Sequence, residues 1–132
     1  MPNILFDPTM RGLAETLTLT QRRHEVLASN LANVETPGFR ARDLDFGSAL
    51  REAFAVRRQS ELGELGEGEP PEEPHVSVVE DRTAPARADG NTVDLDLQMA
   101  KLTANGTRYL ALARLLGMRI GLVRQAIDGG TR

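Results

Sequence analysis

Residues able to act as acids, bases or nucleophiles are scattered along this 132-residue sequence rather than grouped. The histidines, His24 and His75, lie in a predicted helix and a predicted loop, and neither has a nucleophile or carboxylate at catalytic spacing. The chain contains no cysteine, which excludes thiolate nucleophiles and Cys-ligated metals. Serine-nucleophile, HExxH and phosphate-loop motifs are also missing. We therefore expect no catalytic residue, no cofactor and no small-molecule substrate, and interpret the chain as a protein that is not an enzyme.

The segment Asp89–Asp96, with sequence DGNTVDLD, is rich enough in oxygen ligands to suggest calcium. An EF-hand loop needs an oxygen ligand at its fifth position and glycine at its sixth, where this segment has Val93 and Asp94. A glycine turn that leads into a helix explains the segment better, since acids such as Asp94 favour the positive end of a helix dipole. We expect no metal site.

Arginines gather near the end of the first predicted helix, at Arg22-Arg23, Arg40 and Arg42. A nucleic-acid surface would combine such residues with interleaved aromatics, but only Phe39 accompanies them and the net charge of the chain is −3. Solvation or salt bridges to acidic neighbouring subunits explain these arginines better. We expect no nucleic-acid partner.

Two long helices are predicted to position these residues. The first runs roughly from Pro8 to Glu35, begins at Asp7-Pro8 and ends at Thr36-Pro37-Gly38, because proline disfavours a helical residue before it. Its apolar seam is predicted at Leu13, Leu17, Thr20, His24, Leu27, Leu31 and Val34. The second begins after an N-cap in Asn91–Asp94 and closes at Gly129-Gly130. Its seam is predicted at Leu95, Met99, Leu102, Gly106, Tyr109, Ala113, Leu116, Ile120, Val123 and Ile127.

The sequence between the helices has a different composition. Residues 48–59 are compatible with a short helix that has Leu50 and Phe54 on one face, and His75–Val79 with a short strand. Residues 61–81 hold eight acidic residues and no Lys or Arg, with scattered Gly and Pro, which predicts a partly disordered insert. The predicted fold is all-α: a coiled-coil-like pair of helices with a short β or irregular acidic insert. It is divided as helix 1–36, arm and insert 37–90, and helix 91–132, in one domain.

One seam cannot cover all the apolar residues of the second helix. A second apolar face is formed by Leu110, Leu112, Leu115, Met118 and Leu122. Exposed apolar surfaces of that size mark partner contacts, so we expect neighbouring subunits to supply the missing burial.

Residues 28–39, ASNLANVETPGF, resemble the signature of the bacterial flagellar axial proteins of the rod and hook class. Arg40–Phe46 and Asp89–Asp96 are similar to the matching segments of that family's short proximal rod proteins. The resemblance implies a structural rod subunit of the basal body that forms homo-oligomers, transmits torque and lines the export channel. It also implies export by the flagellar type III apparatus, which agrees with an N-terminus unlike a secretory signal. The implied partners are other rod proteins, the rod-base adaptor protein, the membrane ring and the export gate.

Assembly or interaction is assigned to Asn30, Asn33, Thr36, Pro37, Gly38, Phe39, Arg40, Arg42 and Asp94. The hypothesis is that Phe39–Phe46 leaves the helices as an extended arm whose unpaired edge an adjacent subunit satisfies. The amides of Asn30 and Asn33 are predicted to bond backbone in this subunit or the next. Phe6 and Met10 fit the family's Phe-x-x-x-hydrophobic export element, although an apolar contact one helical turn apart explains them equally well.

A helical adaptor or secretion-chaperone-like binding module is the alternative function. In that case the exposed apolar face would capture one helix of a soluble partner.

Overall fold

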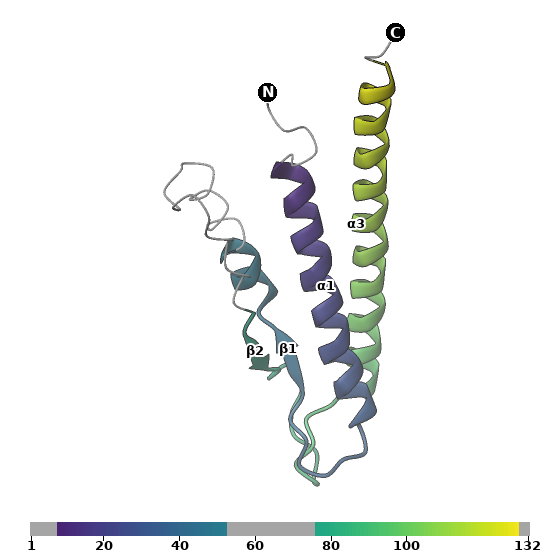
Figure 1. Ribbon diagram of the computed structural model, residues 1–132. Helices are drawn as coiled ribbons and strands as arrows, with labels where there is room; N and C mark the ends of the chain where they lie inside the picture. Colours follow the sequence, from purple (N-terminus) through teal and green to yellow (C-terminus); the bar gives the residue numbers. More distant parts are fainter. Residues whose placement is uncertain (1–7, 53–75, 130–132) are drawn as a thin grey trace.

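The computed structural model describes residues 8–52 and 76–129 (Figure 1). Helix α1 spans Pro8–Ala32 and helix α3 spans Leu95–Gly129. Between them lie strand β1, Arg42–Leu44, helical residues 46–52, and strand β2, Val78–Glu80. In the described part of the chain, neither long helix combines the length and hydropathy needed to cross a membrane.

Helices α1 and α3 lie side by side and antiparallel, and α3 continues well past the N-terminal end of α1 (Figure 1). The predicted fold of two long paired helices with little β structure is confirmed. Helix α1 ends at Ala32, before the predicted Glu35, and the turn that follows closes with hydrogen bonds such as Thr36 N–H to Asn33 O at 3.0 Å. Helix α3 is capped by Asp94, whose Oδ1 accepts from Leu97 N–H at 2.9 Å, rather than by Asn91.

The contact between the two helices is more polar than predicted. Thr20 and Asn30 of α1 and Gln98 and Asn105 of α3 are fully buried, and Asn105 Nδ2 donates to Thr20 O at 2.8 Å. Several predicted seam residues are instead exposed, namely His24, Leu95, Met99, Tyr109, Ile120 and Ile127. The predicted seam is wrong at these positions because apolar spacing identifies a face of a helix but not the element that covers it.

A small core lies where α1 meets the segment after β1. Leu19, Leu44 and Ala49 are buried together, and Phe46 packs against them. The guanidinium of Arg108, from α3, lies over the Phe46 ring at 5.1 Å from its centroid. The predicted arm therefore folds back onto both helices instead of leaving them.

The predicted unpaired edge of the arm is likewise occupied within the chain. β1 pairs antiparallel with β2, with Arg42 opposite Glu80 and Leu44 opposite Val78. The predicted strand His75–Val79 is observed at Val78–Glu80, and the predicted helix 48–59 is observed at residues 46–52. Phe6, Phe54, His75 and most of the acidic insert lie outside the described residues.

Candidate assembly site at the base of the helix pair

We call the turn 33–41 and the loop 81–94 the base of the helix pair, since both lie where α1 ends and α3 begins (Figure 1). Asn30, in the last turns of α1, faces this region. Its Oδ1 accepts from Arg42 N–H at 2.9 Å, and its Nδ2 donates to Arg42 O at 2.6 Å and to Gln98 Oε1 at 3.0 Å. One side chain therefore pairs with β1 as a neighbouring strand would, and also links both helices.

Asn33 makes local contacts instead. Its Nδ2 donates to Ser29 O at 2.8 Å, and its Oδ1 accepts from Thr36 Oγ1 at 3.1 Å. These bonds order the turn that leads to Pro37 and Gly38, both of which are exposed. Gly38 has φ +72°, a left-handed conformation that favours glycine.

Asn91 is the residue of this region whose role sequence reasoning missed. It is fully buried, and its Nδ2 lies 2.7–3.2 Å from the carbonyl oxygens of Asn33, Val34 and Thr36. Its Oδ1 accepts from Val93 N–H at 2.7 Å. These three carbonyl groups belong to the turn that follows α1, so Asn91 supplies the buried donor that fixes this turn against the loop before α3. The sequence did mark this residue, because Asn91 lies in the segment Asp89–Asp96. That segment was interpreted only as the start of the second helix.

The segments 28–39 and 89–96, which carry the family resemblance, are in direct contact. Gly38 N–H donates to Asp89 O at 2.9 Å, and Thr92 N–H donates to Phe39 O at 3.0 Å. Gly90 has φ +79°, and a Cβ there would lie 3.5 Å from Gly38 Cα. The base therefore brings together the two segments on which the family resemblance rests, with a glycine in the left-handed conformation in each.

A chain of charges joins β1 and the loop after β2 to both helices. Arg23 of α1 binds Asp43 at 2.8 Å, while Lys101 of α3 lies 3.3 Å from Asp43 and 2.5 Å from Asp81. Burial raises the pKa of Asp81, but hydrogen bonds from Lys101 and Thr83 outweigh it and lower that pKa to about 2. Burial likewise raises the pKa of Asp43, and the bond from Arg23 lowers it below its usual value. Arg23 is thus engaged within the chain rather than with a neighbouring subunit.

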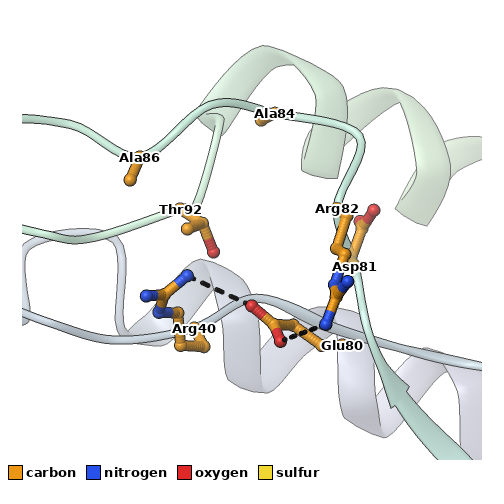
Figure 2. A pocket seen from close by; sticks show the side chains of 7 residues that line it. All are labelled: Arg40, Glu80, Asp81, Arg82, Ala84, Ala86 and Thr92. Carbon is orange, nitrogen blue, oxygen red and sulfur yellow. Dashed lines mark hydrogen bonds and ion pairs between the residues drawn. The ribbon is translucent and has the colours of Figure 1, made fainter.

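A pocket of about 550 Å³ opens beside the base (Figure 2). Arg40 Nη1 and Arg82 Nη2 approach the two carboxylate oxygens of Glu80 at 3.2 and 3.6 Å. Ala84, Ala86 and Thr92 form the facing wall (Figure 2). Within residues 8–52 and 76–129, no group of His, Asp or Glu is arranged to hold a metal ion.

The remaining predicted residues take several positions. Phe39 is half-buried, the side chain of Arg42 is exposed, and Met10 is half-buried in the first turn of α1. The predicted second face of α3 is exposed at Leu110, Leu115, Met118 and Leu122, whereas Leu112 is half-buried. This apolar surface lies partly on the overhang, the part of α3 that extends past α1 (Figure 1).

Comparisons with known proteins agree on one family. The sequence model described as "Flagella basal body rod protein" matches residues 10–40, which include most of α1 and the turn after it. The protein named flagellar basal body rod protein FlgB from Salmonella typhimurium is 31% identical over 133 residues, covering 94% of this chain and 96% of that protein. Proteins of the same name are 34% identical in Yersinia enterocolitica, over 94% and 96% of the two chains, and in Cereibacter sphaeroides, over 88% and 91%.

Proposed function

This chain belongs to the FlgB family of flagellar basal body rod proteins, and we propose that it builds the proximal part of the rod without catalysing a reaction. It is a structural subunit of the basal body rod. In the proposal, several copies assemble with one another and with other rod proteins, carry torque and form the wall of the export channel. In the same proposal, this chain contacts three components below the rod: the adaptor protein at the rod base, the membrane ring and the export gate.

The exposed apolar surface of α3 is the observation that carries this proposal. Leu110, Met118 and Leu122 are each about 60% exposed, although a residue of this kind gains about 2 kcal/mol when fully buried. A single chain has no element left to cover the overhang within the described residues. Lateral packing of neighbouring helices in a tubular layer would cover it, as it does in obligate assemblies.

The base supports the same proposal in a different way. Its buried amides and charge chain hold β1, α1 and α3 in fixed relative positions. A subunit that carries torque must transmit force without changing shape, and buried hydrogen bonds and ion pairs between its elements serve that purpose. The roles in assembly of Asn33, Thr36, Pro37, Gly38, Phe39 and Arg42 remain part of this proposal.

The adaptor alternative is not favoured, because the relatives named as rod proteins match nearly the whole chain rather than one helix.

Electron microscopy of basal bodies from a strain that lacks this gene tests the proposal. We expect the membrane ring to persist while rod and hook are absent, and both to return when the gene is restored. Normal rods and hooks in the deleted strain would contradict it. Quantifying the secretion of other early export substrates in the same strain separates a structural defect from loss of the export apparatus.

A further inference from the structure

We propose that the pocket between Arg40 and Arg82 binds the glutamate-rich segment 61–74 of a second copy of this chain, so that copies join head to tail. This inference rests on the proposed rod function and adds which surfaces of two copies meet. It gives a role both to the arginines of the base and to the acidic insert.

The pocket is already built to hold a carboxylate. Glu80 is shared by Arg40 and Arg82, at 3.2 and 3.6 Å, each through one guanidinium nitrogen. A guanidinium carries five N–H donors, so both arginines retain donors for another carboxylate. Their side chains are 61% and 85% exposed, and the small side chains of Ala84 and Ala86 line the same pocket (Figure 2).

The segment proposed to bind has the complementary charge. Residues 61–74 contain six glutamates and no Lys or Arg. The next two acids along the chain, Glu80 and Asp81, are each paired with a basic residue in the structure. Opposite charges concentrated on different parts of one chain favour ordered association of copies and exclude like-charged alignments.

Residues 52 and 76, which flank segment 53–75 in the sequence, lie at the end of the β pair opposite the base. β1 runs away from the base into residues 46–52, and β2 returns toward the base (Figure 1). The pocket lies at the base, beside Thr92 and Glu80. Copies that point in the same direction and are staggered along the helix axes bring the far end of the β pair of one copy toward the base of the next. Such a contact between unlike surfaces produces an open helical assembly, as a rod requires.

Cysteine crosslinking in assembled rods tests this contact, because the chain has no cysteine of its own. Two variants, Ala84→Cys and Glu72→Cys, are expressed together in cells that build rods, and purified basal bodies are oxidised mildly; Ala84 lines the pocket, and its replacement leaves Arg40 and Arg82 in place. We expect a disulfide-linked pair of copies about tenfold more abundant than with a matched control, Arg124→Cys paired with Glu72→Cys, since Arg124 is exposed on α3 far from the pocket.

Three results would overturn the inference: no enriched crosslink, a crosslink that forms only within one chain in a third variant that carries both cysteines, or a crosslink to a different rod protein. Detection of the chain itself in the purified basal bodies keeps these failures distinct from failure of the rod assignment. If the chain is absent from them, the proposed function fails first.

Charge reversal provides a second measurement. The double variant Arg40→Glu with Arg82→Glu should lower the number of complete rods about fivefold, and adding Glu72→Lys with Glu73→Lys should restore most of the loss. Circular dichroism of the purified double variant checks that the helices remain. Rod numbers that stay at the wild-type level in the double variant, or that are not restored by the added lysines, would contradict the inference.

Discussion

Near the base of the helix pair, buried side-chain amides form hydrogen bonds to backbone groups, as a neighbouring backbone segment would. Asn30 pairs with both backbone groups of Arg42, and Asn91 fixes the turn that follows α1. The sequence motif identified Asn30 as important, and its place near the helix end suggested backbone bonding. Asn91 was interpreted as a helix cap because its true acceptors lie more than 50 residues earlier in the chain, a distance that no local pattern reports.

Replacement of Asn91 should be costly. Asn91→Ala removes the donor shared by three carbonyl groups in a buried position, so we expect the free energy of unfolding to fall by about 2 kcal/mol. Urea denaturation, monitored by circular dichroism, measures this loss in the free energy of unfolding. Asn33→Ala is the control, because its bonds are exposed and should be worth less than about 1 kcal/mol. Equal losses in the two variants would refute the role of Asn91 in fixing the turn after α1.

Gly38 should matter through its backbone. Space around the site is open, but φ is +72°, so Gly38→Val should cost about 1–2 kcal/mol and impair rod assembly while secretion continues. Gly38→Asn should be milder, because asparagine tolerates this conformation. Motility assays and immunoblots of the secreted chain measure both effects. Wild-type rods with Gly38→Val would show that the turn geometry is not needed for assembly.

At the scale of elements, α1 is covered on two faces, by α3 and by the segment of β1 and residues 46–52. Heptad spacing predicted the helices and their pairing because that pattern depends only on local sequence. Heptad spacing failed to predict the face of α1 that contains Leu19. The residues that cover this face come from β1 and residues 46–52, where the sequence has only weak periodicity. Heptad spacing also failed for Gln98 and Asn105, which are buried in a seam where leucine would be expected.

The charge chain that joins these elements predicts weaker folding in acid. Asp81 has a pKa of about 2 in the folded chain against a usual value of 3.8, so its ionised form stabilises the fold above about pH 4. That contribution, about 2 kcal/mol, should disappear as pH falls from about 4 to about 2. Urea unfolding at a series of pH values measures it.

Asp81→Asn is the control for this pH dependence. The variant should be less stable at neutral pH, because Lys101 loses its nearest carboxylate, and it should lose less further stability between about pH 4 and 2 than the wild type. An identical acid profile in both proteins would assign the effect to other carboxylates, such as Asp43.

At the scale of the whole molecule, the unequal lengths of α1 and α3 create the overhang and its apolar surface. Leu122→Glu should leave the monomer stable to within about 0.5 kcal/mol, because the side chain is exposed, but should abolish its incorporation into rods. Gln125→Glu adds the same charge to the overhang at an exposed polar residue and should be tolerated. Immunoblots of purified basal bodies compare them. Normal incorporation of Leu122→Glu would exclude this surface from assembly.

The sequence predicted the exposure of Leu110, Leu115, Met118 and Leu122, because one helix cannot cover two apolar faces of its partner. It could not predict that the arm folds back, since that depends on the amide of Asn30 reaching Arg42. Sequence patterns report the periodicity of each element, whereas the packing of the arm depends on pairs of residues far apart in the chain.

The contact between Asn33 and Asn91 also closes a loop of 58 residues in each folded chain. The entropy lost on closing a flexible loop grows only with the logarithm of its length, so doubling it costs about 0.6 kcal/mol. The segment between residues 52 and 76 can therefore lengthen or shorten during evolution at little expense to the helix pair. New surface specificity can arise there while the subunit body stays the same.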